Sequence, residues 1–285
     1  MNKPTMNFMA CEAEYDEAEV VLFGAPFDGT VSYRPGARFG PAAIRTESYG
    51  IETYSPYLER DLEELSVFDG GDLELPFGSS RRALDMIRDF TAQVVKDGKL
   101  PLMTGGEHLV TLGAVEALAA VYPHLHVLHF DAHADLREEY LGDTLSHACV
   151  LRRCHDLLGD NRIFQLGVRS MTAEENAFAK VHVTQHKFDL SKLEEVIGAL
   201  GNAPVYVTLD LDVLDPAFFP GTGTPEPGGV TYLELQHAVH QMGRLNVVGA
   251  DLVELAPMLD GSGASTLVAC KLVRELLLAL SINNG

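Results

Sequence analysis

Seven short runs of apolar and β-branched residues recur along the chain, and segments with helical periodicity separate them. Most of these runs show no alternation of polar and apolar residues, which is typical of parallel strands covered by helices on both faces. Because no long linker interrupts the alternation, the pattern indicates one α/β domain with three layers. The predicted strands are Val20–Gly24, Leu65–Asp69, Leu100–Thr104, His126–Phe130, Arg162–Gly167, Val205–Leu209 and Val247–Leu252.

Eight helices are expected between these strands. Three of them follow a Ser or Thr with Glu three residues later, a pattern that predicts a capping box. The pairs are Thr172 and Glu175, Ser191 and Glu194, and Thr231 and Glu234. The predicted helices are Pro41–Tyr49, Ser79–Lys96, Leu109–Val121, His147–Leu158, Ala173–Lys180, Lys192–Leu200, Tyr232–Met242 and Ser265–Leu280.

The chain is acidic, with 21 basic and 41 acidic residues and a net charge of −20. This charge argues against nucleic acid and anionic membranes as partners, and it fits a cationic substrate. We expect residues 1–19 to be an acidic N-terminal segment and residues 20–285 to form one catalytic domain. The first 19 residues lack the apolar stretch of a secretory signal, and no run of 18 apolar residues predicts a membrane span, so the cytoplasm is the expected location.

Two clusters of metal-binding residue types follow two of the predicted strands. Asp131, His133 and Asp135 come directly after His126–Phe130, and Asp210 and Asp212 come directly after Val205–Leu209. Open α/β sheets bind ligands at the carboxyl ends of their strands. Residues at i, i+2 and i+4 share one face of a strand, so we expect each cluster to converge on one point.

A single histidine, His108, precedes both clusters in the segment Gly105-Gly-Glu-His108. Four carboxylates cannot share a closed site unless cations neutralise them. Four carboxylates with two imidazoles suit two divalent first-row metals about 3.5–4 Å apart. An isolated pair of Asp residues at a strand end is usually a cap or a turn, but this explanation does not account for six such residues together.

These clusters resemble the metal signatures of the ureohydrolase superfamily, which includes the arginases and agmatinases. The matching segments are Gly106-Glu-His108, Asp131-Ala-His133-Ala-Asp135 and Asp210-Leu-Asp212-Val-Leu-Asp215-Pro. Pro26-Phe-Asp, Arg34-Pro-Gly-Ala-Arg38-Phe-Gly-Pro and Pro220-Gly-Thr-Gly-Thr-Pro-Glu-Pro-Gly-Gly229 resemble the agmatinase branch more closely than arginase. The resemblance extends from about Val20 to Leu280. It implies an arginase-like fold, with a mostly parallel sheet of about eight strands and helices on both faces.

The resemblance also implies two Mn²⁺ ions per chain, with a bridging hydroxide as the nucleophile. In the family pattern, Asp131 and Asp210 would bridge the two metals, His108 and Asp135 would complete one site, and His133 and Asp212 would complete the other. His129 would lie behind the ligands without joining them, and Asp215 would form a turn or support a ligand.

Three residues are candidates for catalysis. His147 matches the catalytic histidine of the family, and Glu254 matches the carboxylate that holds the substrate guanidinium. A carboxylate can bind a planar guanidinium through paired hydrogen bonds. Asp135, beside the metals, is the nearest proton donor for the departing amine, and His147 could relay protons to solvent.

The expected reaction is hydrolysis of a guanidino compound to urea and an amine, with agmatine to putrescine first. In the loop 136–146, Glu138, Glu139 and Asp143 suit a distal ammonium, whereas Arg137 suits a carboxylate. The alternative is therefore a guanidinobutyrase or another hydrolase of ω-guanidino acids, and a non-catalytic metal- or polyamine-binding relative is a third reading. The family resemblance suggests a homotrimer or homohexamer.

Overall fold

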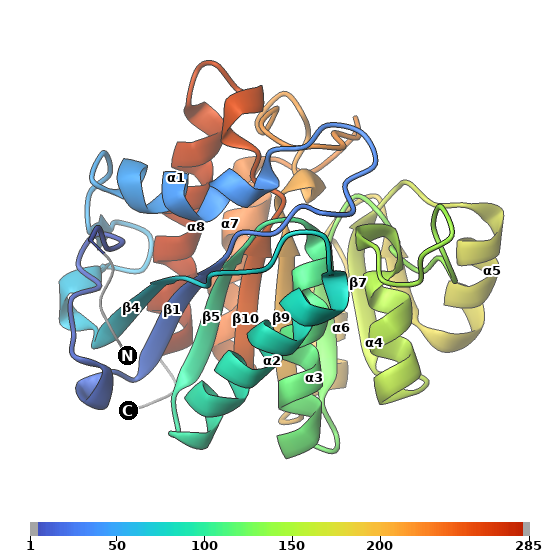
Figure 1. Ribbon diagram of the computed structural model, residues 1–285, viewed down its shortest axis with the longest axis horizontal. Coiled ribbons are helices and arrows are strands. Elements are labelled where there is room, and N and C mark those ends of the chain that lie inside the picture. The colour runs from blue at the N-terminus through green and yellow to red at the C-terminus, as the bar shows by residue number, and fades with distance from the viewer. Residues whose placement is uncertain (1–4, 282–285) are drawn as a thin grey trace.

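An eight-stranded sheet runs through the protein in the order β4-β1-β5-β10-β9-β6-β7-β8 (Figure 1). The computed structural model describes residues 5–281, and all neighbouring strands of this sheet are parallel. The strands are β1 Val20–Ala25, β4 Val67–Asp72, β5 Leu100–Gly105, β6 His126–Phe130, β7 Ile163–Val168, β8 Thr184–Lys187, β9 Pro204–Asp210 and β10 Asn246–Val253. The predicted fold class, with about eight mostly parallel strands, is confirmed.

Helices cover both faces of the sheet, which gives the three predicted layers (Figure 1). One face packs against α1 (Gly40–Ser48), α6 (Leu193–Leu200), α7 (Tyr232–Gln241) and α8 (Ala264–Leu280). The other face packs against α2 (Ser80–Lys96), α3 (Thr111–Val121), α4 (Val150–Leu158) and α5 (Ala173–His182). A two-stranded hairpin of β2 (Tyr54–Ser55) and β3 (Arg60–Asp61), which the sequence did not predict, lies outside the main sheet.

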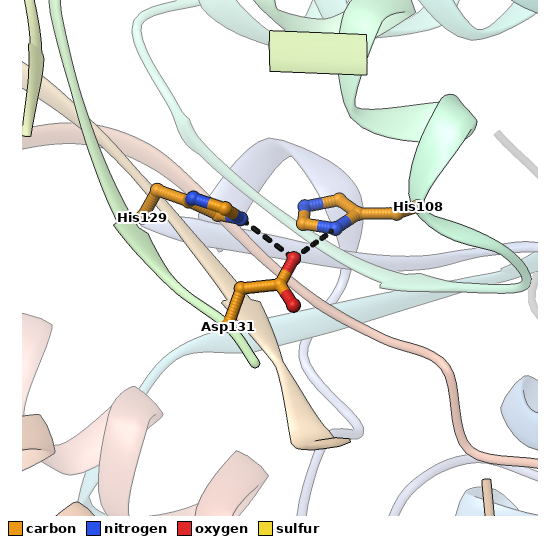
Figure 2. Close-up of side chains that lie close together, drawn as sticks. All are labelled: His108, His129 and Asp131. Atoms are coloured by element: carbon orange, nitrogen blue, oxygen red, sulfur yellow. Dashed lines mark hydrogen bonds and ion pairs between the residues drawn. The ribbon is translucent and has the colours of Figure 1, made fainter. Parts of the chain in front are cut away.

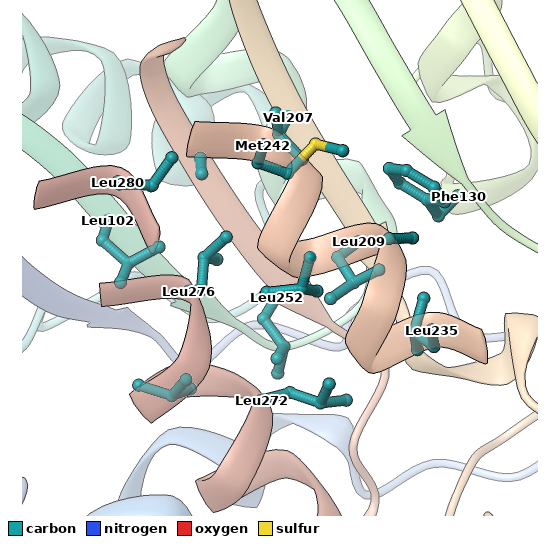
Figure 3. Close-up of a cluster of buried hydrophobic side chains, with 14 of the residues drawn as sticks. Leu102, Phe130, Val207, Leu209, Leu235, Met242, Leu252, Leu272, Leu276 and Leu280 are labelled. Atoms are coloured by element: carbon teal, nitrogen blue, oxygen red, sulfur yellow. The ribbon is translucent and has the colours of Figure 1, made fainter. Parts of the chain in front are cut away.

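The larger core lies between α7, α8 and the sheet (Figure 3). Leu272, Leu276 and Leu280 follow one another at intervals of four, so they line one side of α8 and pack with Leu102 and Leu252 of the sheet. Burial on both faces explains why the central strands lack polar alternation. Truncating one of these leucines to alanine is expected to cost about 2–5 kcal/mol.

Two local expectations need correction. The eighth strand, β8, was not located from the sequence, because Thr184–Lys187 is a polar, half-buried edge strand. The capping box at Ser191 is wrong: α6 begins at Leu193, and the Ser191 hydroxyl instead bonds to Asp189. The capping boxes predicted at Thr172 and Thr231 are both present.

The described part of the N-terminal segment packs against the edge of the sheet. Phe8 is fully buried, and its backbone N–H donates to Asp69 Oδ2 at 2.8 Å. The division of the chain at residue 19 remains a prediction. Within residues 5–281, the helices are all too short or too polar to cross a lipid bilayer.

Candidate metal centre

The candidate site lies at the carboxyl edge of four neighbouring strands, β5, β10, β9 and β6. His108 follows β5 in the 3-10 turn His108–Val110, and Asp131 follows β6 directly. Asp210 is the last residue of β9, and Glu254 follows β10. Val253 pairs in register with Asp210, so these strands end at the same level and their following residues meet.

Around His108, the side chains form a first group. His108 Nδ1 lies 3.0 Å from Asp131 Oδ2, 3.2 Å from Asp210 Oδ2 and 3.3 Å from Asp135 Oδ2. All four residues are buried. One imidazole nitrogen therefore shares a small volume with three carboxylate oxygens.

A second group forms around His133, next to the first. His133 Nδ1 lies 3.0 Å from Asp212 Oδ2 and 3.4 Å from Asp131 Oδ1. Asp131 thus presents one oxygen to each group, as a bridging ligand would. The structure brings together the six residues predicted as metal ligands.

The expected reason for this convergence is wrong, because neither cluster is a continuous strand. Strand β6 ends at Phe130, and Asp135 has a left-handed backbone with φ of 53°. Asp212 lies in the 3-10 turn Leu211–Val213, and its N–H donates to Asp210 Oδ1 at 2.8 Å. Turns after the strands, rather than one strand face, direct these side chains toward one another.

The donor set fits divalent cations. His108 Nδ1 is buried and forms no hydrogen bond, although three carboxylate oxygens surround it. Separations of about 3 Å are expected between neighbouring ligands that lie about 2.1 Å from a shared octahedral ion. Burial and the charge of Asp131 raise the pKa of Asp135 to about 7. Burial and the charge of Asp212 likewise raise the pKa of Asp210. Cations between these groups would remove that repulsion.

His129 contacts this group through Asp131 (Figure 2). Gln165 Nε2 donates to His129 Nδ1 at 2.9 Å and to the carbonyl oxygen of Ala134 at 2.7 Å. Because a carbonyl oxygen can only accept, the bond to Ala134 fixes the direction of the Gln165 amide. The remaining ring nitrogen of His129, Nε2, therefore carries the proton and donates to Asp131 Oδ2 at 2.8 Å. This arrangement supports the prediction that His129 lies behind the ligands without joining them.

His147 lies at the wall of the same cavity. Its backbone N–H donates to Thr30 Oγ1 at 3.0 Å, and Thr30 in turn donates its hydroxyl to Glu107 Oε1 at 2.7 Å. With that hydroxyl proton engaged, Thr30 can only accept from His147 Nδ1, which lies 3.3 Å away. His147 Nε2 then faces Ser32 at 3.3 Å, and burial lowers the pKa of His147 to about 4.

Sequence reasoning did not find Thr30 or Glu107. Glu107 is fully buried, and burial raises the pKa of its carboxyl to about 8. The available signal was its place between Gly106 and His108. Gly106 leaves no room for a side chain, since a Cβ there would lie 1.9 Å from Phe27 O. The backbone is thus packed tightly beside the site.

Glu254 is held against the backbone of the first group. Its Oε1 accepts from His108 N at 2.7 Å, and its own N–H donates to Gly106 O at 2.9 Å. Glu254 also has a left-handed backbone, with φ of 67°. Burial and the nearby Glu107 raise the pKa of Glu254 well above its ordinary value.

A cavity of about 290 Å³ opens onto both groups, and His147 and Glu254 both line it. Arg137, Tyr140 and Glu175 line it as well. The Arg137 guanidinium lies 4.6 Å from the centre of the Tyr140 ring and 3.8 Å from Glu175 Oε2. The cavity wall therefore carries a cation that already has two partners.

The acidic residues of the loop 136–146 do not line this cavity. Glu138 pairs with Arg152, and Asp143 accepts from the N–H of Leu145. The expectation that Glu138, Glu139 and Asp143 suit a distal ammonium is therefore unsupported. Asp215 caps a turn, accepting from the N–H groups of Ala217, Gly228 and Gly229, as expected for a turn-forming residue.

Comparisons with known proteins agree with this fold and site. The Arginase family profile matches residues 18–279. An agmatinase from Bacillus anthracis is 50% identical to this chain over 275 residues, and an agmatinase from Bacillus subtilis is 48% identical to it over 276 residues. Each alignment covers 95% of both chains. A crystal structure from Clostridium difficile, 47% identical, has a TM-score of 0.92 and covers 95% of this chain and 100% of its own.

The chain belongs to the arginase family, a class of α/β ureohydrolases. Within the family, its similarity is to agmatinases, over nearly the full length of both chains. The expectation of an agmatinase-like ureohydrolase is confirmed.

Proposed function

We propose that the protein is a binuclear manganese hydrolase that cleaves agmatine to urea and putrescine. The observation that carries this proposal is the convergence of His108 Nδ1 with three carboxylate oxygens at 3.0–3.3 Å. The full-length similarity to agmatinases supports agmatine as the substrate.

The metal ligands would be the six residues of the two groups. Carboxylate oxygens favour Mg²⁺, Ca²⁺ or Mn²⁺, whereas imidazole favours later first-row metals, so a mixed set suits Mn²⁺. When bound, two such cations would supply a water with a pKa lowered toward about 7 as the nucleophile. The ligands are His108, Asp131, His133, Asp135, Asp210 and Asp212.

The remaining groups act on the substrate and its protons. Glu254 binds the guanidinium through paired hydrogen bonds, which places the guanidinium carbon before the nucleophile. As the bond from this carbon to the tail nitrogen breaks, the departing amine needs a proton, and we assign its donation to Asp135, a carboxyl that lines the cavity beside His108. His147, neutral near pH 7 and lining the cavity, carries protons between the site and solvent.

A second substrate class follows from Arg137. A cation in the cavity wall would attract a tail carboxylate, as in guanidinobutyrate, and would repel a tail ammonium. Tyr140 and Glu175 already partner this cation, which weakens the effect and leaves agmatine as the preferred substrate. A third reading, a non-catalytic metal- or polyamine-binding protein, would keep the metals and release no urea.

The test is urea release from agmatine, arginine, guanidinobutyrate and guanidinopropionate with added Mn²⁺. Urea from agmatine above the other three supports the proposal. A preference for guanidinobutyrate assigns the protein to the guanidino acid hydrolases, and no urea from any compound supports the non-catalytic reading. We also propose that the protein is a cytoplasmic homotrimer or homohexamer. Size-exclusion chromatography with light scattering measures the mass of the assembly and tests this oligomeric state.

A further inference from the structure

We infer that Asp251, acting through Thr208, keeps the proton of His108 on Nε2 and so keeps Nδ1 free to bind metal. Asp251 would thus be a positioning residue. This inference rests on the proposed function, because it concerns how a proposed ligand is prepared for a cation. None of the six ligands is involved except His108 itself.

Asp251 is a buried carboxylate with only hydroxyl partners. Its Oδ1 accepts from Thr208 at 2.7 Å, and its Oδ2 accepts from Tyr206 at 2.6 Å and from Thr111 at 2.7 Å. These four side chains are fully buried. Across residues 5–281, no ion pair involves Asp251. An unpaired buried carboxylate is costly, so a specific role is expected for it.

The strand register places this carboxylate behind the site. Asp251 on β10 pairs directly with Thr208 on β9. Tyr206 lies two residues before Thr208 and fits beside Gly249, where a Cβ would lie 3.1 Å from the ring. The arrangement is therefore built into the central strands rather than into a mobile loop.

Counting protons gives the tautomer of His108. A threonine hydroxyl has one proton to donate. Thr208 donates its proton to Asp251, so toward His108 Nε2, which lies 2.9 Å away, it can only accept. His108 Nε2 must then carry the ring proton, and the lone pair of the neutral ring is on Nδ1.

Without this constraint, the ring would favour the opposite tautomer in the metal-free protein. Three carboxylate oxygens surround Nδ1, and each would attract a proton there. A proton on Nδ1 would occupy the position that the cation needs. Asp251 opposes this attraction from the other side of the ring, in the way that outer hydrogen bonds orient metal-binding histidines.

Four variants of the full chain test the inference. Asp251→Asn keeps the shape of the side chain but favours a reversed hydrogen bond, in which residue 251 donates to Thr208 and Thr208 donates to His108. Its amide oxygen would accept from Tyr206 and Thr111, leaving its NH₂ to donate to Thr208. Thr208→Val removes the hydroxyl, and Thr208→Ser restores it. Thr104→Val is the matched control, because Thr104 is also a buried strand threonine and, among the residues that the structure describes, its hydroxyl bonds to Phe23 O alone.

Two measurements are made on each metal-free protein: Mn²⁺ stoichiometry and affinity by calorimetry, and the melting temperature. We expect Asp251→Asn and Thr208→Val to weaken binding of one of the two Mn²⁺ ions by about 10–100-fold. Thr208→Ser should bind within about 3-fold of the wild type, as should Thr104→Val. If Thr104→Val loses as much Mn²⁺ affinity as Thr208→Val, the loss comes from a general packing effect and the inference is overturned.

The inference and the proposed function fail in different ways. Wild-type protein that binds no Mn²⁺ would refute the proposed metal centre. Wild-type protein that binds two ions, with the affinity unchanged in Asp251→Asn and Thr208→Val, would refute the role of Asp251 alone. If Asp251→Asn does not fold, Thr208→Val against Thr208→Ser still decides the question.

Discussion

Glu254 Oε1 accepts a hydrogen bond of 2.7 Å from the backbone N–H of His108. The carboxylate proposed to hold the substrate is therefore attached to the backbone of a proposed metal ligand. Because the bond uses the main chain, a substitution at Glu254 that preserves an acceptor should leave the His108 side chain in place.

For this reason we expect Glu254→Gln to separate substrate binding from metal binding. The glutamine oxygen can still accept from His108 N, but the neutral amide cannot hold a guanidinium by charge. A hydrogen bond to a charged group contributes about 1.5–3 kcal/mol, so kcat/KM for agmatine should fall by roughly 10- to 10²-fold. Mn²⁺ content should remain at two per chain. Loss of metal in parallel with activity would place Glu254 among the structural supports of the metal site instead.

Removal of one carboxylate should affect both metals. Asp210 offers Oδ2 to the group around His108, and its Oδ1 holds the N–H of Asp212. Asp210→Asn should therefore weaken both sites, whereas Asp215→Asn, in a turn outside the ligand groups, should leave both occupied. Elemental analysis after gentle purification measures the occupancy. A fully active wild-type enzyme with one tightly held zinc would contradict the two-manganese proposal.

His147→Ala should lower kcat while the metals stay bound. A general acid–base typically contributes about 10²–10⁴-fold to rate, and His147 has no ion pair with the six proposed ligands within the described chain. His155, which does not line the cavity and bonds to Asp160, provides the control, and His155→Ala should keep kcat within about 2-fold. Steady-state kinetics with parallel metal analysis is the measurement. An equal loss of Mn²⁺ and rate in His147→Ala would show that His147 is structural.

The partly buried His147 should also make the stability of the metal-free protein depend on pH. Burial lowers its pKa from the ordinary 6.5 to about 4, so between these values the unfolded chain binds a proton that the folded chain does not. The free energy of unfolding should therefore fall as pH falls from about 6.5 to about 4, by roughly 3 kcal/mol at most. Urea unfolding of wild type and His147→Asn at pH 7 and pH 5 isolates this contribution. Identical pH dependence in both proteins would argue that His147 is solvated.

Substrate choice should respond to the charge at Arg137. We expect agmatine to exceed guanidinobutyrate by about 10²-fold in kcat/KM in the wild type, and Arg137→Gln should widen this ratio, because it removes a cation that repels the ammonium tail. Arg152→Gln is the control: Arg152 pairs with Glu138 away from the cavity, so its loss should leave the ratio unchanged. Kinetics with both substrates decides the matter. If the ratio of agmatine to guanidinobutyrate kcat/KM is smaller in Arg137→Gln than in the wild type, Arg137 influences substrate choice through its contacts with Tyr140 and Glu175 and not through its charge.

Much of the fold was predictable because burial on both faces leaves a clear signature. The central strands read as continuous apolar runs, and the ends of each predicted run lie within three residues of the ends of an observed strand. The edge strand β8 has no such run, since Thr184–Lys187 is half-exposed and polar. Its pairing with β7 depends on tertiary contacts that a local pattern does not contain.

The candidate ligands were predictable by residue type and order, but their geometry was not. Alternation along a strand placed Asp131, His133 and Asp135 on one face, whereas the left-handed backbone of Asp135 brings its carboxylate to His108. The partners behind the ligands were also missed. Thr208 and Asp251 are 43 residues apart in sequence, and only the register of β9 and β10 joins them.

The positive φ angles of Asp135 and Glu254 imply a conflict between heat tolerance and turnover. A left-handed backbone at a residue with a side chain costs roughly 1–2 kcal/mol, and glycine would remove that cost. A laboratory screen that rewards only survival at high temperature should therefore recover glycine at positions 135 and 254, and those clones should have lost hydrolysis. A more thermostable enzyme is better obtained by keeping both strained residues and adding stabilising substitutions on the face of the sheet that α7 and α8 cover.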